Sequence, residues 1–236
     1  MSFFASTRPL IFAHRGGCAL GPENTVKAFD RGIATGADGL ELDVHLSADG
    51  VVVVHHDDTL DRTTNGTGPI AARTAAELAQ VDAGYRFTKD GGFPFRGQGP
   101  GIPTLEEVLR RYPRVPIIVE MKVDTVEMGR AAAEVVRAAG AVESACLAGF
   151  GRRSAQGARE ALPQVAASAC TRETRMALYR SWVRWPVRRV GYHTYQVPER
   201  AEGMRVVSPR FIRVSHRSEE HTSELQSRET ISYAVF

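Results

Sequence analysis

Seven side chains that could do chemistry stand in or beside short apolar segments between residues 14 and 122. They are two histidines, three carboxylates and two cations: His14, His56, Glu41, Asp43, Glu120, Arg15 and Lys122. Cleaving a phosphodiester near neutral pH requires positive charge on the phosphoryl oxygens, a base for the nucleophile and an acid for the leaving oxygen. The seven residues supply each of these parts, so the set is suited to phosphodiester chemistry.

The three carboxylates are candidate metal ligands. Glu41 and Asp43 are two residues apart in an apolar strand and therefore point to the same side, and Glu120 lies in a second apolar strand. Burying anions is costly unless a cation compensates them. Ligation by oxygen alone favours Mg²⁺ or Ca²⁺ over a structural zinc ion.

The two histidines and the two cations complete the candidate site. Imidazole titrates near neutral pH, so His14 and His56 can divide the acid and base roles. The fixed positive charges of Arg15 and Lys122 are suited to holding a phosphate.

Either His56 or the adjacent His55 could be the histidine beside the carboxylates, and the choice between them depends on a hairpin. The segments 39–46 and 51–55 are too close in sequence for a parallel crossover, so they must pair antiparallel. A two-residue loop at Ala48-Asp49 or at Asp49-Gly50 places His56 beside the carboxylates, whereas a three-residue loop selects His55. We predict a two-residue loop and choose His56.

The elements that must position these side chains alternate between strands and helices. Strands are expected at 10–13, 39–46, 51–55, 117–121, 145–150, 164–169 and 194–197, and helices at 25–35, 104–111, 125–139, 154–162, 172–183 and 209–216. Repeated βα units predict an α/β fold with a parallel sheet covered by helices. Spacing alone does not separate a barrel from an open sheet, but reactive residues at the ends of several early strands favour a TIM-type barrel.

Composition excludes several classes of protein. The net charge of +3 is small and scattered, which argues against nucleic-acid binding. No segment reaches the roughly 18 apolar residues of a membrane span, and Met1–Leu10 does not resemble a signal peptide. The three widely spaced cysteines favour buried, reduced thiols, and a cytoplasmic enzyme is the expected class. Trp182 and Trp185 are expected to pack against the protein, and the oligomeric state is undetermined.

Several motifs in order along the chain resemble the signature of the glycerophosphodiester phosphodiesterase family. They are His14-Arg15-Gly16, Pro22-Glu23-Asn24-Thr25, Gly39–Val44, His56–Thr64, Ile102–Leu105 and Glu120-Met121-Lys122. The resemblance runs from about Ile11 to about His216.

The resemblance implies a TIM barrel with a small insertion after the His56 strand. It implies His14 and His56 as the acid/base pair, one divalent metal on Glu41, Asp43 and Glu120, and phosphate bound by Arg15 and Lys122. The implied reaction hydrolyses a small-molecule glycerophosphodiester to sn-glycerol 3-phosphate and an alcohol. The alternatives are a phospholipase-type phosphodiesterase or lyase, which requires an exposed apolar rim, and an inactive fragment.

Two segments depart from the regular βα pattern. Residues 82–101 form a Gly- and Pro-rich insertion that is a lid over the site, a wall of the substrate pocket or a surface excursion. Residues 217–236 resemble a translated sequencing adapter, so we interpret 1–216 as a partial barrel domain and 217–236 as a non-native tail. The barrel is then expected to lack about its last two βα units, with unpaired edges beside the strands at Ile11 and Tyr195.

Overall fold

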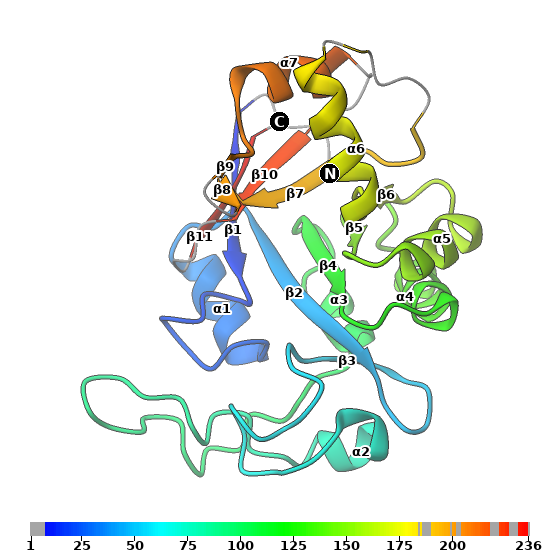
Figure 1. Ribbon diagram of the computed structural model, residues 1–236. Coiled ribbons are helices and arrows are strands. Elements are labelled where there is room, and N and C mark those ends of the chain that lie inside the picture. Colours follow the sequence, from blue (N-terminus) through cyan, green and yellow to red (C-terminus); the bar gives the residue numbers. More distant parts are fainter. Residues whose placement is uncertain are drawn as a thin grey trace.

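The computed structural model describes residues 8–183, 185, 190–198, 200–201, 204–217, 222–226 and 231–235. Its centre is a nine-stranded sheet in which helices cover the outer face (Figure 1). Six parallel strands were expected before residue 198, and all six form: β1 (Leu10–His14), β2 (Gly39–Leu46), β4 (Ile117–Met121), β5 (Ala145–Ala148), β6 (Ala166–Ala167) and β7 (Thr194–Pro198).

The sheet closes on itself. Its strand order is β6-β5-β4-β2-β1-β11-β10-β7, and β3 (Val52–Val54) pairs with β2 on the side of this path. A parallel bridge between Ser168 and Thr194 joins the end after β6 to β7. The α/β barrel expected from the sequence is therefore present.

The predicted unpaired edges are wrong. The edge of β1 pairs antiparallel with β11 (Ile231–Val235), and the edge of β7 pairs in parallel with β10 (Thr222–Gln226). The two strands form an antiparallel pair with each other, so a hairpin fills the place where two further βα units were expected. Side chains of this hairpin lie outside the described residues, as do 218–221, 227–230 and Phe236.

The helices begin where the sequence provides N-caps. The threonine before each of α1 (Val26–Ala34), α3 (Leu105–Arg111) and α4 (Val126–Ala138) accepts a backbone N–H of the first turn, and Glu107 completes a capping box at α3. The remaining elements are η1 (Ile70–Ala72), α2 (Ala75–Leu78), α5 (Arg152–Ala161), α6 (Thr171–Trp182), β8 (Arg200–Ala201), β9 (Met204–Arg205) and α7 (Pro209–Arg217).

Strand alternation separates the helix-facing core from the barrel interior. Leu40, Leu42 and Val44 of β2 are fully buried in the main core beneath the helices, while Glu41 and Asp43 occupy the opposite face. On the inner face, Phe12 and Ile118 belong to a separate apolar cluster that fills the barrel. The reactive carboxylates therefore share the interior face with an apolar packing layer.

Helix α1 lies unusually close to the turn after β1. A Cβ added at Gly16, where φ is +80°, would stand 2.8 Å from the Phe29 nitrogen. A Cβ at Gly32 would stand 2.8 Å from the Gly16 carbonyl oxygen and 2.7 Å from the Ala13 Cβ. Glycine at both positions permits this backbone contact, because any side chain would push the helix outward.

The remaining expectations from composition are partly confirmed. The three cysteines are free thiols, with Cys146 and Cys170 buried and Cys18 partly exposed. Among the described helices, none has the length and apolarity needed to cross a bilayer. Trp182 packs edge-on against Tyr179 but is 45% exposed, and Trp185 is 65% exposed.

Candidate active site

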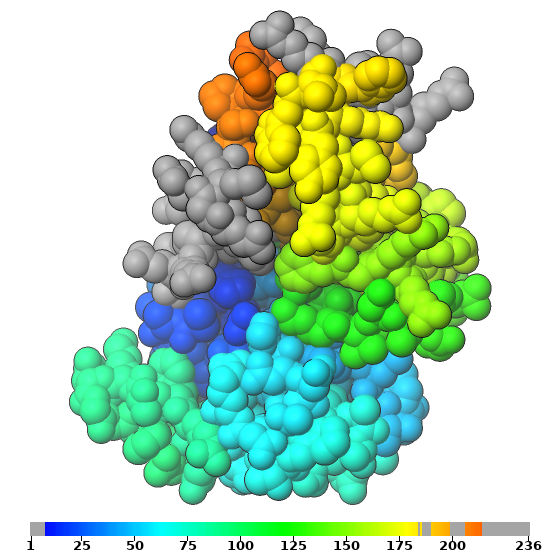
Figure 2. Space-filling view, in the orientation of Figure 1, coloured from blue at the N-terminus to red at the C-terminus, as the bar shows by residue number. Residues whose placement is uncertain are grey.

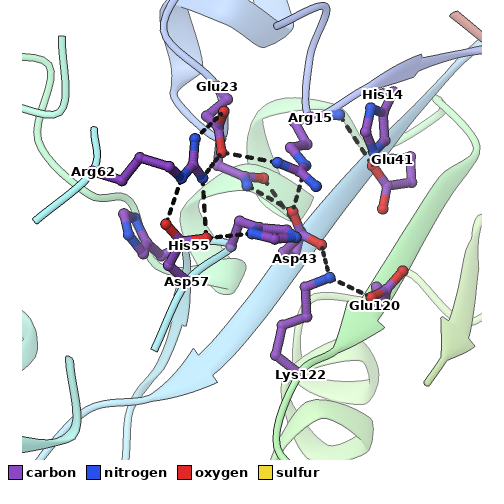
Figure 3. A network of polar contacts seen from close by, with 12 residues as sticks. His14, Arg15, Glu23, Glu41, Asp43, His55, Asp57, Arg62, Glu120 and Lys122 are labelled. Carbon is purple, nitrogen blue, oxygen red and sulfur yellow. Dashed lines mark hydrogen bonds and ion pairs between the residues drawn. The ribbon is translucent and has the colours of Figure 1, made fainter. Parts of the chain in front are cut away.

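Strand pairing brings the three predicted metal ligands together in the barrel. His14 of β1 lies opposite Glu41 of β2, and Asp43 of β2 lies opposite Glu120 of β4. One carboxylate oxygen from each of Glu41, Asp43 and Glu120 lies within 4.8 Å of the others, and all three side chains are buried. Figure 3 shows them converging with the surrounding cations.

Lys122 lies among these carboxylates. Its Nζ is 2.9 Å from Asp43 Oδ1 and also donates to Glu120 Oε1. A single side-chain cation thus bridges two of the three candidate ligands. The carboxylates of this cluster create a place where positive charge is favoured.

Arg15 ties the first strand to the same cluster. Its backbone N–H donates to Glu41 Oε2 at 3.0 Å, and its guanidinium Nε lies 3.3 Å from Asp43 Oδ2. The residue has a left-handed backbone with φ of +51°, which is strained for an arginine. This turn places both the backbone N–H and the guanidinium of Arg15 against the carboxylates.

The predicted two-residue hairpin loop is wrong. Val44 pairs with Val54 and Leu46 with Val52, and the Ser47 N–H donates to the Val51 carbonyl, so the loop is the three residues 48–50. This register places His55, not His56, opposite Asp43. The strand ends at Val54, however, and the alternation of faces ends with it.

The histidines then point in different directions. His55 is buried, and its Nε2 lies 3.2 Å from the Thr59 carbonyl oxygen. His56, in contrast, lies near enough to Asp43 and Glu120 to interact electrostatically with both. His56 is therefore the member of the pair that stands beside the carboxylates, although the register argument for it was incorrect.

A chain of ion pairs connects His56 to Arg15. His56 Nδ1 lies 2.6 Å from Asp57 Oδ1, and Arg62 joins this carboxylate to Glu23. Glu23 in turn accepts from the guanidinium of Arg15 at 3.1 Å. The carboxylate of Asp57 thus fixes the orientation of the His56 ring.

Burial and neighbouring charges perturb the titrating groups of the site. Burial, with Arg15 nearby, lowers the pKa of His14. Burial would raise the pKa of Asp43, but the charges of Lys122 and Arg15 outweigh it and the pKa is lowered. Burial raises the pKa of Glu120. Burial opposes the charge on Lys122, but Asp43 and Glu120 raise its pKa.

The charge balance of the network fits a divalent cation. With His14 and His56 counted as neutral, it contains five carboxylates and three side-chain cations, an excess of two negative charges. The carboxylates are Glu23, Glu41, Asp43, Asp57 and Glu120, and the cations are Arg15, Arg62 and Lys122. The buried oxygen donors of Glu41, Asp43 and Glu120 are the kind that Mg²⁺ and Ca²⁺ prefer.

Asn24 is a site residue that the sequence did not single out for this role. Its amide Nδ2 donates to Asp43 Oδ2 at 2.8 Å, and its Oδ1 accepts the Asp43 backbone N–H at 3.2 Å. Its backbone is left-handed, with φ of +58°, which asparagine tolerates better than most residues. Thr25, the next residue, caps α1, and Asn24 clamps Asp43.

Replacing Asn24 tests this clamp. Asn24→Ala and Asn24→Gly both remove the two hydrogen bonds and should lower activity by about 10–100-fold, as loss of a residue that orients a ligand does. Asn24→Ala should also be less stable than Asn24→Gly by about 1–2 kcal/mol, because alanine disfavours the left-handed backbone. Thermal unfolding and hydrolysis assays measure both effects. Asn65→Ala, at the second asparagine of the chain, is the control and should retain activity.

A cavity of about 250 Å³ opens beside the ion-pair chain. Glu23 and Arg62 form one side, and Ala83, Arg86 and Phe87 of the insertion form another. The 82–101 segment was expected to be a lid, a pocket wall or a surface excursion. Its first part, with Ala83, Arg86 and Phe87, lines this cavity, whereas most of residues 88–99 are exposed on the surface.

Comparison with known proteins identifies relatives of this chain. A model described as the glycerophosphoryl diester phosphodiesterase family matches residues 14–184. A glycerophosphodiester phosphodiesterase of Caldanaerobacter subterraneus is 50% identical over 101 residues, which are 43% of this chain and 39% of that protein. The Bacillus subtilis enzyme of the same name is 39% identical over 109 residues, 44% of this chain and 36% of that protein. The matched segment thus spans less than half the length of these relatives.

Solved structures show the same fold. A glycerophosphodiester phosphodiesterase from Agrobacterium tumefaciens superposes with a TM-score of 0.70 at 29% identity, covering 89% of this chain and 83% of that one. An Oleispira antarctica phosphodiesterase, solved in complex with its product sn-glycerol 3-phosphate, superposes with a TM-score of 0.60 at 25% identity. It covers 81% of this chain and 76% of that one.

Proposed function

Because the chain belongs to the glycerophosphoryl diester phosphodiesterase family, a family of hydrolases, we propose that it hydrolyses glycerophosphodiesters to sn-glycerol 3-phosphate and an alcohol. The observation that carries the proposal is the convergence of Glu41, Asp43 and Glu120 within 4.8 Å. This cluster lies beside two histidines and two cations at the carboxyl ends of the barrel strands, where barrel enzymes have their active sites.

Glu41, Asp43 and Glu120 would hold one divalent cation, either Mg²⁺ or Ca²⁺. When bound, such an ion supplies positive charge to a phosphoryl oxygen and favours ionisation of a bound hydroxyl. The excess of two negative charges in the network supports a divalent occupant, and Asn24 holds Asp43 in place for it.

Arg15 and Lys122 would bind the phosphate of the substrate. Both cations already lie against the carboxylate cluster, at 3.3 Å and 2.9 Å from Asp43. The backbone strain at Arg15 is consistent with a residue held in position for binding. The guanidinium offers the planar pair of donors that suits two phosphoryl oxygens.

His14 and His56 would share the proton transfers. Nε2 of His14 lies 3.8 Å from Glu41 Oε2, at the edge of the carboxylate cluster. Asp57 engages Nδ1 of His56 and so leaves Nε2 to exchange a proton with the substrate. One histidine takes the proton of the attacking hydroxyl, and the other gives a proton to the leaving alkoxide. The attacking hydroxyl is either water or a neighbouring glycerol hydroxyl, which gains from proximity.

The bound product in the Oleispira structure supports the substrate class. All seven proposed site residues lie between His14 and Lys122, so the proposal does not depend on residues 217–236.

A direct assay tests the function. The chain should release sn-glycerol 3-phosphate from glycerophosphocholine in the presence of Mg²⁺ or Ca²⁺, measured by coupling to glycerol-3-phosphate dehydrogenase. A variant lacking both histidines, His14→Ala/His56→Ala, should show no release above the uncatalysed rate. Release of free choline phosphate and glycerol instead would place the cleaved bond on the other side of phosphorus and contradict the proposal.

A further inference from the structure

Helix α6 and the segment after it expose a large apolar surface. Four side chains of this segment are between 45% and 72% exposed: Met176, Tyr179, Trp182 and Val183. Phe150, on the loop before α5, lies next to them and is 53% exposed. Trp185 adds a further 65% exposed ring. Monomeric proteins seldom expose so many large apolar side chains together unless the patch binds something. We call Phe150, Met176, Tyr179, Trp182, Val183 and Trp185 the α6 face.

One side of α6 is buried against the protein, and this fixes which side faces outward. Ala177, Leu178 and Ser181 are buried. The first two belong to an apolar cluster that also contains Tyr195 and Phe211. Met176, Tyr179 and Val183 recur at the i, i+3, i+7 spacing of the opposite side. The helix therefore has two apolar sides, one in the core and one open. Figure 2 shows α6 in yellow, open on the front of the molecule.

Arginines surround the exposed apolar side chains. Arg152, Arg172 and Arg175 are exposed, and Arg180 is half-buried. In the part of the chain that the structure describes, none of the four has an ion-pair partner. Two cavities of about 420 Å³ each lie between these arginines and the apolar side chains.

The acidic groups of this region are already engaged. Glu173 accepts from the Arg159 guanidinium at 2.7 and 2.9 Å, and from the Cys170 N–H at 2.8 Å. Asp124 accepts the N–H groups of Arg153 and Ser154 at the start of α5. The charge that the α6 face presents outward is therefore positive.

We propose that the α6 face docks on the surface of a membrane that contains anionic lipids. A helix lying in a membrane interface combines aromatic and aliphatic side chains, which enter the headgroup region, with arginines that meet the lipid phosphates. Tryptophan and tyrosine are the side chains that favour this interface. The proposal goes beyond the hydrolysis of a small diester, which needs no membrane.

The charge of the face argues against the other occupants. A second copy related by a two-fold axis would bring the four arginines against themselves, which repels. Nucleic acid would neutralise the arginines, but its phosphate backbone offers nothing to Met176 and Val183. An anionic bilayer satisfies both the charge and the apolar side chains.

The chain contains only two tryptophans, and both lie on this face, so intrinsic fluorescence reports docking directly. On addition of phosphatidylcholine vesicles containing phosphatidylglycerol, we expect the chain to co-sediment and its tryptophan emission to shift to the blue. Vesicles of phosphatidylcholine alone should give much weaker binding, and the binding to anionic vesicles should weaken with salt.

Two double variants separate the charged and the apolar contributions. Arg172→Ala/Arg175→Ala should weaken binding by about fivefold per arginine, while Arg110→Ala/Arg114→Ala, on α3 and the turn after it, should leave it unchanged. Tyr179→Ala/Val183→Ala should remove the blue shift, whereas Phe93→Ala, at an exposed aromatic of the insertion, should retain it. Hydrolysis of soluble glycerophosphocholine without vesicles should be the same in the wild type and in the double variants, which separates this proposal from the proposed function.

Three results would overturn the proposal. One is a wild-type chain that neither sediments with anionic vesicles nor changes its fluorescence. Another is a dimer in light scattering that is abolished by Tyr179→Ala/Val183→Ala, since the face would then bind a second copy. The third is binding of single-stranded RNA that is stronger than binding of the anionic vesicles and depends on Arg172 and Arg175.

Discussion

Removal of divalent cations with a chelator should abolish hydrolysis, and Mg²⁺ or Ca²⁺ should restore it. Replacing any one of the three ligands, as in Glu120→Gln, should lower the affinity for the ion by about tenfold or more, because each variant loses a charged oxygen donor. The replaced carboxylate is buried at the centre of the cluster, so no water-exposed group can substitute for it.

A second readout does not depend on activity. Because an ion that binds only the folded state stabilises it, Mg²⁺ or Ca²⁺ should raise the melting temperature of the wild type. The rise should be much smaller in Glu41→Gln, Asp43→Asn and Glu120→Gln, and unchanged in Glu143→Gln, which alters an exposed carboxylate elsewhere. Full activity in excess chelator would remove the metal from the proposed function.

His56→Ala should lower kcat by about 10²–10⁴, the usual contribution of a positioned acid or base. His55→Ala is the natural control, because the two residues are adjacent and differ in what they contact. His55 is buried and faces the Thr59 carbonyl, so its replacement should cost about 1–3 kcal/mol of stability with little change in kcat.

His55→Ala and His56→Ala should give opposite results depending on which of the two histidines takes part in catalysis. Loss of kcat in His55→Ala with a normal rate in His56→Ala would mean that the hairpin register, and not the end of β3, decides which imidazole reaches the substrate. Thermal unfolding of both variants distinguishes a lost catalytic group from a lost fold.

Strand periodicity predicted that Glu41 and Asp43 lie together, whereas their meeting with Glu120 depends on the pairing of β4 with β2. Glu41 and Asp43 share a face of β2, and any parallel neighbour that carries Glu120 at its end meets them there. The six parallel strands and the capped helices followed from the same local patterns. The strands and helices need no knowledge of how distant segments meet.

The hairpin was missed because its loop length depends on one backbone conformation. Gly50 has φ of +77° at the third loop position, which is typical of a three-residue loop with a left-handed final residue. The glycine was visible in the sequence and was the signal that favoured the longer loop. The choice of His56 relied on the shorter loop, whereas its position near the carboxylates depends on the end of β3 at Val54, which alternation does not reveal.

Tertiary contacts account for the other differences. The hydrogen bonds from Asn24 to Asp43 connect two separate segments and require a left-handed backbone at Asn24, which strand or helix periodicity cannot predict. The exposure of Trp182 and Trp185 depends on which side of α6 meets the core, since both sides are apolar. The pairing of β10 and β11 with the barrel joins opposite ends of the chain.

Because α1 contacts the turn after β1, the size of the side chain at position 32 of α1 affects the candidate site, although that position lies outside it. One methyl group at Gly32 would collide with the Gly16 carbonyl oxygen and the Ala13 Cβ, so α1 must move away from the barrel to accept it. Asn24 immediately precedes the capped start of α1, and its two hydrogen bonds to Asp43 tolerate little displacement. Position 32 carries no reactive atom, yet even one added methyl group there would shift α1 as a rigid body and disturb Asp43, the candidate metal ligand that Asn24 holds.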